Sequence, residues 1–151
     1  MKVDLSGKVA VVTGGGGVLC GNMAKRLAQC GAGVAILDLK EEAAQRIADE
    51  IRNSGGNAIG VAANVLDKAS LAEAEKTVRE KLGVCDILVN GAGGNHPRGT
   101  TSHEFFLPGK LKDNSGETTF FDLDPAGIGF VFNLNFLGTL LTCQTFCRAM
   151  A

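Results

Sequence analysis

Val9-Ala-Val-Val-Thr-Gly-Gly-Gly-Gly-Val-Leu-Cys-Gly21 is the stretch that decides the fold of this chain. Its opening residues are small or β-branched and mostly apolar, which predicts a buried strand. Four consecutive glycines follow, and a helical pattern then runs to Gly31. A strand, a glycine turn and a helix start together present bare backbone N–H groups, which can bind a diphosphate. A flexible glycine-rich connector is the alternative, because a glycine run alone is a weak signal.

The strand predicted next favours the diphosphate site over the connector. Residues 33–38 are apolar until the last one, Asp38. Asp38 follows Gly14 at close to the spacing of about 20 residues that places an acid on the adenosine ribose of a dinucleotide. Its carboxylate would repel the 2′-phosphate of NADP, so NAD is the expected cofactor. A solvated acid at a strand end is the other interpretation of Asp38.

One group of residues is therefore predicted to hold the diphosphate and the adenosine ribose. It comprises the glycine turn, the start of the helix after it and the end of the second strand. These residues are Gly14, Gly16, Gly17, Val18, Leu19, Asp38 and Leu39.

The composition is that of an ordinary globular protein. The chain has 151 residues, of which 45% are hydrophobic and 21% charged, and its net charge is −1. This size suits one domain. Because lysine and arginine are spread along the chain, nucleic acid is not expected as a partner. No apolar run approaches the roughly 20 residues of a membrane span and no signal-peptide block is seen, so no membrane contact is expected.

The five cysteines lie inside predicted helices and strands. Their odd number and placement are typical of buried, reduced thiols in a cytoplasmic protein. Cys143 and Cys147 would share one helix face, a spacing that could suit a metal or redox pair. They have no nearby histidine or further cysteine in the sequence, so no metal site is expected.

Strand and helix patterns alternate along the first 90 residues. Strands are predicted at 9–13, 33–38, 57–63 and 86–90, and helices at 18–30, 40–53 and 67–82. Apolar strands that alternate with helices are typical of a parallel sheet covered on both faces. The sequence thus predicts an α/β fold, a Rossmann-like doubly wound parallel sheet with strand order 3-2-1-4. Residues 95–121 interrupt the pattern as a long irregular loop, and Asp124 with Pro125 then predicts the start of a strongly apolar helix.

Four landmarks in this order resemble the short-chain dehydrogenase/reductase family. Thr13-Gly14 opens the glycine turn, and Asp38 ends the second strand. Asn90-Gly91-Ala92-Gly93 is similar to the family's N-N-A-G, and Asn135 with Gly138 matches the asparagine of its long helix. The string Val-Asn-Gly-Ala-Gly-Gly-Asn-His-Pro looks like the D-mannonate oxidoreductase (fructuronate reductase) subgroup.

The resemblance implies hydride transfer between NAD and a sugar acid, D-mannonate or D-fructuronate. Other polyols and 3-oxoacyl groups are the alternative substrates. The resemblance also places Asn90, Ala92 and Gly93 against the ribose on the nicotinamide side of the cofactor. It places Asn64 and Val65 against the adenine. Asn90 could equally be a turn-forming residue.

Asn135 is the one catalytic residue that the resemblance implies in this chain, because the family's helix asparagine helps to order a proton-relay water. A buried asparagine that bonds the helix backbone is the structural alternative. His96 and His103, with Arg98, Lys110 or Lys112, would shape a lid over an anionic sugar acid or stay in a solvated loop. A histidine acting as the base is a further alternative.

The chain also departs from the family pattern. Val18 and Cys20 stand where the family has its second and third glycines, so either the turn is re-registered or a helix contact is looser. The family's serine, tyrosine and lysine cannot be completed, since the chain contains no tyrosine. We therefore expect residues 1–151 to be an incomplete NAD-binding domain, inactive alone, from a longer enzyme that forms tetramers or dimers. A nucleotide-binding module without turnover is the alternative.

An oligomer would form through the helix near 136–150. A stripe on this helix fits such an interface, and it fits burial against the chain's own sheet equally well. The stripe consists of Leu137, Leu140, Leu141, Gln144 and Cys147.

Overall fold

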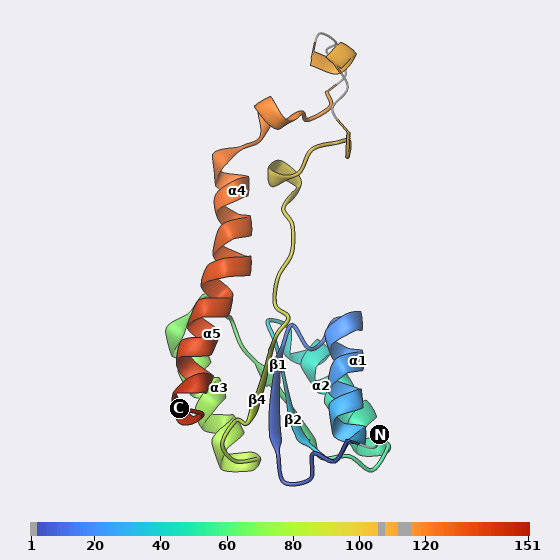
Figure 1. The fold of residues 1–151 in the computed structure, drawn as a ribbon, viewed down its shortest axis with the longest axis vertical. Coiled ribbons are helices and arrows are strands. Elements are labelled where there is room, and N and C mark those ends of the chain that lie inside the picture. The colour runs from blue at the N-terminus through green and yellow to red at the C-terminus, as the bar shows by residue number, and fades with distance from the viewer. Residues whose placement is uncertain (1–2, 106–107, 112–115) are drawn as a thin grey trace.

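The computed structural model describes residues 3–105, 108–111 and 116–151. Its centre is a sheet of four strands in the order β3-β2-β1-β4, with each neighbouring pair parallel (Figure 1). The strands are β1 (Val9–Thr13), β2 (Gly33–Asp38), β3 (Ala58–Ala62) and β4 (Ile87–Asn90). The predicted fold class and strand order are confirmed.

Helices cover both faces of this sheet. α1 (Val18–Gln29) and α2 (Glu41–Asn53) lie on one face, and α3 (Lys68–Lys81) and α5 (Gly138–Phe146) lie on the other (Figure 1). Successive strand residues point to opposite faces, so Val12 packs toward α1 and α2 while Val11 packs toward α3 and α5. Because both sides are buried, the strands need apolar residues at nearly every position, which explains their uniform composition.

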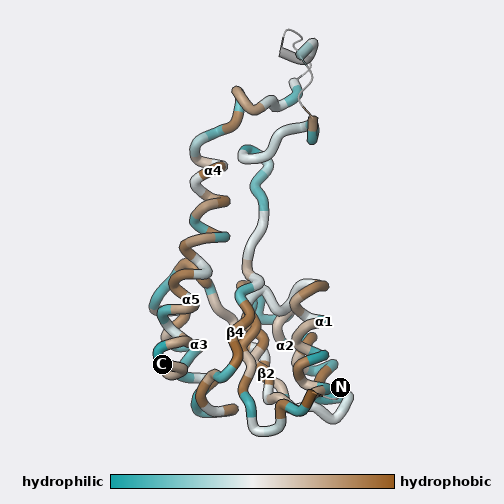
Figure 2. The backbone as a smooth tube through the Cα atoms, in the orientation of Figure 1, coloured by the Kyte–Doolittle hydropathy of each residue, from teal (hydrophilic) through white to brown (hydrophobic). Residues whose placement is uncertain are grey.

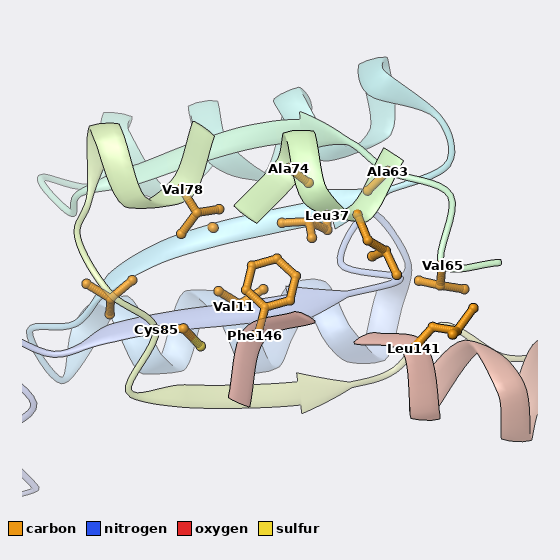
Figure 3. Packing of buried hydrophobic residues seen from close by; sticks show 12 residues of the cluster. Val11, Leu37, Ala63, Val65, Ala74, Val78, Cys85, Leu141 and Phe146 are labelled. Carbon is orange, nitrogen blue, oxygen red and sulfur yellow. The ribbon is translucent and has the colours of Figure 1, made fainter. Parts of the chain in front are cut away.

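Phe146 anchors the last helix to the sheet. Its side chain is 2% exposed and lies among Val11 of β1, Val78 of α3 and their neighbours (Figure 3). Full burial of such a side chain contributes on the order of 2–3 kcal/mol. The contact fixes α5 beside β4, so that Leu134, just before α5, packs against the same cluster.

The described residues between 95 and 124 form an arm that projects beyond the sheet (Figure 1). Its described part holds three short 3-10 turns, η1 (Pro97–Gly99), η2 (Pro108–Leu111) and η3 (Phe120–Asp122). Residues 106–107 and 112–115 of the predicted loop lie outside the described residues. An ion pair connects the beginning of the arm to its end, since Arg98 Nη1 lies 2.7 Å from Asp124 Oδ2.

One helical run follows the arm. It consists of α4 (Pro125–Phe132), the π-helical segment η4 (Asn133–Leu137), α5 and the short turn η5 (Cys147–Ala149). Asp124 caps its start as predicted, by accepting from the Ala126 N–H at 2.8 Å.

This helical run is longer and more apolar than the sequence analysis predicted. From Pro125 to Ala149 it has 25 residues and is by length and composition able to cross a membrane, and Figure 2 shows its predominantly hydrophobic colouring. The expectation that no apolar run approaches that length is therefore wrong. Asparagine, threonine and glutamine interrupt the run without adding a charge, so its mean hydropathy stays high. A core helix passes the same test, and the second half of this one packs on the sheet through Phe146.

Candidate functional site

A cleft of about 530 Å³ opens at the carboxyl ends of the strands. Its walls are the connections that follow the four strands, the last residue of β2, the first turn of α1 and one residue of η4. The lining residues are Gly14, Gly17, Val18, Leu19, Cys20, Asp38, Leu39, Ala63, Asn64, Val65, Gly91, Ala92, Gly93 and Leu134. Open α/β sheets bind their ligands at this edge, where the strand order reverses.

The glycine turn after β1 is packed too closely to carry side chains. Gly14 has a φ of 62°, and a Cβ there would lie 2.7 Å from the carbonyl oxygen of Gly91. A Cβ on Gly16 would lie 2.6 Å from Ala43 Cβ in α2. The turn is thus pressed between α2 and the turn after β4, and only glycine fits at these positions.

α1 begins at the cleft with its first amides uncovered. Its N-cap is Gly17, which makes no side-chain cap, and its first turn holds no acidic residue. The positive end of the helix dipole and its free N–H groups are therefore available to a negative ligand. Val18 and Leu19 are 82% and 75% exposed and stand at the mouth of the cleft.

Gly17 and Gly21 are the glycines at and after the start of α1 in this chain. Gly17 caps the helix, and Gly21 makes the close contact with its surroundings. A Cβ on Gly21 would lie 3.0 Å from Ile47 Cδ1 and 3.2 Å from the Gly15 carbonyl oxygen. Val18 and Cys20 can carry side chains because they line the open cleft. Whether the turn is re-registered or a helix contact is looser than in the family stays open.

Asp38 joins the end of β2 to the glycine turn. Its Oδ2 accepts from the Gly16 N–H at 3.0 Å, and its Oδ1 accepts from the Lys40 N–H at 3.1 Å. The side chain also lines the cleft. Each carboxylate oxygen accepts more than one hydrogen bond, so hydroxyl donors in the cleft can still bind Asp38.

Asn64 and Val65 form the wall that follows β3. Asn64 Oδ1 accepts from the Leu66 N–H at 3.0 Å, so the oxygen predicted to bind adenine is partly used by the chain itself. Its second lone pair and its NH₂ group remain for a ligand. Val65 is 7% exposed because it packs on α5, where a Cβ on Gly138 would lie 2.9 Å from Val65 Cγ2.

The turn after β4 is held by the buried hydroxyl of Thr13. Thr13 Oγ1 accepts from the N–H groups of Gly91 and Ala92 at 3.1 and 3.2 Å. The side chain of Asn90 lies against α5 instead of the cleft, where Nδ2 donates to Cys143 Sγ at 3.2 Å. Asn90 Oδ1 is buried and has no hydrogen-bond partner among the described residues.

Asn135 ties the same turn to the last helix. Its Nδ2 donates to the carbonyl oxygens of Gly94 and Val131 at 2.8 Å each, and its Oδ1 accepts from the Gly94 N–H at 3.2 Å. It lies in the π-helical segment η4, and such segments often occur at functional sites. The hydrogen bond to Val131 agrees with the alternative of an asparagine that bonds the helix backbone, although Asn135 is exposed and not buried. Its catalytic role stays a prediction.

The cysteines only partly match the expectation of buried thiols. All five are free, but only Cys85 is buried, since the others lie on the flanks of helices. Burial raises the pKa of the Cys20 thiol and the nearby Asp38 carboxylate raises it further, so Cys20 lines the cleft as a neutral group. Within the described residues, no cluster of three or more His, Cys, Asp or Glu side chains could hold a metal ion.

Two side chains of the arm, Arg98 and His103, lie on acids, whereas Lys112 and the side chain of Lys110 lie outside the part of the chain that the structure describes. Arg98 lies on Asp124, and His103 Nε2 lies 3.1 Å from Glu117 Oε1. The ring of His96 is 5.0 Å from that of Phe130. None of these arm residues is among those that line the described cleft.

Most of the residues predicted to bind the cofactor meet in this cleft. All except Gly16 and Asn90 line it, and Gly16 lies directly behind the lining, bonded to Asp38. The sequence reading missed Cys20, Ala63, Gly91 and Leu134. Cys20 and Gly91 lie inside the quoted motifs and could have been found there, whereas Leu134 depends on how the last helix packs.

Comparisons with known proteins agree with this geometry. The family described as short chain dehydrogenase matches residues 8–151. An uncharacterized oxidoreductase of Haemophilus influenzae is 48% identical over 147 residues, which is 97% of this chain and 50% of that protein. An uncharacterized oxidoreductase of Bacillus subtilis is 45% identical over 148 residues, 97% of this chain and 51% of that protein. The chain thus spans about half the length of the curated relatives it matches.

Solved structures give the same result. A Haemophilus influenza protein, provisionally assigned as a D-mannonate oxidoreductase and crystallised with bound NAD, superposes with a TM-score of 0.91 at 47% identity. The match covers 98% of this chain and 52% of that one. A hydroxysteroid dehydrogenase from Escherichia coli superposes with a TM-score of 0.78 at 28% identity, covering 97% of this chain and 54% of that one.

Proposed function

Because the chain belongs to the short-chain dehydrogenase family, we propose that it forms the NAD-binding part of an oxidoreductase acting on a sugar acid. The single observation that carries the proposal is the cleft in which the uncapped start of α1 faces Asp38. A diphosphate would bind at the amides that begin α1, and the adenosine ribose would donate to Asp38. The negative charge of Asp38 disfavours a 2′-phosphate, so NAD is preferred to NADP.

The remaining walls suit the two ends of the cofactor. Leu39, Asn64 and Val65 would contact the adenine, and Ala92 and Gly93 would pass beneath the ribose on the nicotinamide side. Asn90 would support this turn indirectly, because its side chain bonds to Cys143 of α5 instead of facing the cofactor. The bound nicotinamide would supply the hydride chemistry, and the residues of this chain would bind and orient it.

Asn135 is proposed to act next to the reacting centre. Its side chain holds the Gly94 peptide, and it would help to order water for proton transfer. The chain contains no tyrosine, so none of its own side chains takes the role of the family's tyrosine acid/base. A nucleotide-binding module without turnover is the second candidate function.

The substrate is proposed to be D-mannonate or D-fructuronate. Support comes from the string that runs from Val89 to Pro97 and from the provisional assignment of the Haemophilus influenza protein with bound NAD. The arm, with His96, His103 and Arg98, is proposed to cover this anionic substrate, and the homo-oligomer is part of the same proposal. The free thiols of the five cysteines support a cytoplasmic location for the protein.

Calorimetric titration of the chain with NADH and NADPH tests the proposal. We expect NADH to bind and NADPH to bind at least about tenfold more weakly, as one repulsive charge contact of about 1.4 kcal/mol requires. Asp38→Asn should reduce that preference, because Asn keeps an acceptor for the Gly16 N–H and removes the charge. Tighter binding of NADPH, or no heat with either nucleotide, would exclude the NAD assignment.

Two further measurements separate the candidate functions. In the complete open reading frame, a Tyr-x-x-x-Lys sequence and NADH oxidation with D-fructuronate would support the enzyme. Nucleotide binding without that sequence and without oxidation of NADH would support the module without turnover.

A further inference from the structure

The Gly16 residue of the phosphate turn is held from three sides. Its N–H donates to Asp38 Oδ2 at 3.0 Å, and its carbonyl oxygen accepts from Arg46 Nη2 at 2.9 Å. Its α-carbon lies against α2, since a Cβ there would be 2.6 Å from Ala43 Cβ. A carboxylate, a guanidinium and a helix surface therefore fix one glycine, the residue type with the greatest backbone freedom.

Arg46 reaches the turn from the middle of α2. Its Nη1 lies 3.2 Å from Glu50 Oε1, and Glu50 also pairs with Lys25 of α1. The guanidinium thus uses one nitrogen on Glu50 and the other on the Gly16 carbonyl. Because a guanidinium is planar with its donors in a fixed fork, the first contact orients the second. The side chain of Arg46 is 58% exposed, so its effect on the turn comes from the direction of its hydrogen bonds and not from burial.

We infer that Arg46 is a positioning residue for the phosphate-binding turn, acting through the Gly16 backbone. With both ends of Gly16 fixed, Gly17 is held at the start of α1 in the orientation that exposes the first helical amides. A turn held before the ligand arrives loses less conformational entropy on binding, which increases affinity. The positive charge of Arg46 also partly offsets the negative charge of Asp38, which would otherwise repel the bound diphosphate. This inference rests on the proposed dinucleotide binding.

Arg52 provides a matched control on the same helix. Its Nη1 donates to the Ala58 carbonyl oxygen at 2.7 Å, and its other nitrogen pairs with Asp49. Arg52 therefore makes the same two kinds of contact as Arg46, one to a carbonyl and one to an acid. It is not among the residues that line the cleft.

Calorimetry with ADP-ribose, which carries the diphosphate without the nicotinamide, measures the effect on affinity. We expect Arg46→Gln to raise the dissociation constant about tenfold, because the turn must then be ordered on binding, and ordering the backbone of one residue costs on the order of 1.4 kcal/mol. Arg52→Gln should leave the constant within about twofold of the original chain. Arg46→Lys should recover part of the loss, because its ammonium group can still donate to the Gly16 carbonyl oxygen but lacks the fixed fork of the guanidinium. Equal affinities of Arg46→Gln and Arg52→Gln would overturn the inference.

Amide hydrogen exchange of the ligand-free chain gives a readout that needs no binding. In Arg46→Gln, peptides that contain residues 14–19 should exchange faster, whereas in Arg52→Gln they should exchange as in the original chain. Unchanged exchange in Arg46→Gln would contradict the inference even if ADP-ribose binds. If the original chain binds no ADP-ribose, the proposed function fails, and the exchange comparison still decides whether Arg46 holds the turn.

Discussion

Glycine has opposite effects at two positions of this chain. Gly14 has a φ of 62°, and a Cβ there would lie 2.7 Å from the Gly91 carbonyl oxygen and 2.9 Å from the Ala92 nitrogen. Both atoms belong to the backbone, so neither can move aside as a flexible side chain would. We predict that Gly14→Ala lowers the free energy of unfolding by about 2–4 kcal/mol, as measured by urea denaturation.

Gly129 is the control for this substitution. It lies in α4, where an added Cβ would meet nothing within 4 Å. Gly129→Ala should therefore increase stability by about 0.5–1 kcal/mol, because alanine favours a helix over glycine. If both variants change stability in the same direction, the packed turn is not the cause.

Cys85 makes stability depend on pH in the alkaline range. Burial raises the pKa of its thiol to about 11, above the ordinary value of 9.0. Since the folded chain holds this proton more tightly than the unfolded chain, the contribution to stability is complete below pH 9. It is lost progressively as the pH rises from 9 through 11. We predict a fall in the free energy of unfolding over this interval that is smaller in Cys85→Ala.

Absorbance of the thiolate near 240 nm gives the direct measurement for Cys85. The chain contains no tyrosine and no tryptophan, so the signal in this pH range comes from its five cysteines alone. Thiols with a raised pKa should titrate late in the folded chain and at their ordinary pKa in urea, and Cys85→Ala should lose the absorbance of one thiolate from the latest part of that titration. An unchanged titration in Cys85→Ala would assign the latest step to another cysteine.

The regular elements could be predicted from the sequence because their signals are local. β1 and β2 have the predicted bounds, and Asp67 caps α3 by accepting from the N–H groups of Ala69 and Ser70. Much of the cleft could also be predicted, since Gly14 and Asp38 end consecutive parallel strands and must lie at one edge of the sheet. What could not be predicted depends on long-range packing, such as the placement of Leu134 in the cleft and the contact between Asn90 and Cys143.

Asp124 joins two elements through two separable contacts. Its Oδ1 caps α4 by accepting from the Ala126 N–H at 2.8 Å, and its Oδ2 pairs with Arg98 at 2.7 Å. Asp124→Asn keeps an acceptor for the cap and removes the ion pair, so it should cost at most about 1 kcal/mol of stability. Asp124→Ala removes both contacts and should cost about 1–2 kcal/mol more than Asp124→Asn. Thermal unfolding of both variants tests this order, and equal losses would show that α4 does not depend on its cap.

At the scale of the whole molecule, the last helical run has two different faces. Leu141 is 7% exposed and belongs to the core, whereas Leu137 and Leu140 are 37% and 42% exposed. The predicted apolar stripe therefore serves both purposes: Leu141 packs on the chain's own sheet, whereas Leu137 and Leu140 remain exposed for an interface. Phe132 and Phe136, one helical turn apart, are 68% and 69% exposed on the same run. An exposed apolar surface of this kind is typical of a protein–protein contact.

We predict that this face drives self-association of the chain. Sedimentation velocity over a wide range of protein concentration should show a dimer or tetramer at the upper end. Phe132→Gln with Phe136→Gln should weaken the association at least about tenfold, because aromatic side chains contribute most to such contacts. Phe120→Gln with Phe121→Gln is the matched control, since each of these side chains is 71% exposed but lies on the arm. A chain that sediments as a monomer throughout, or equal weakening by the two pairs, would contradict an interface on the last helix.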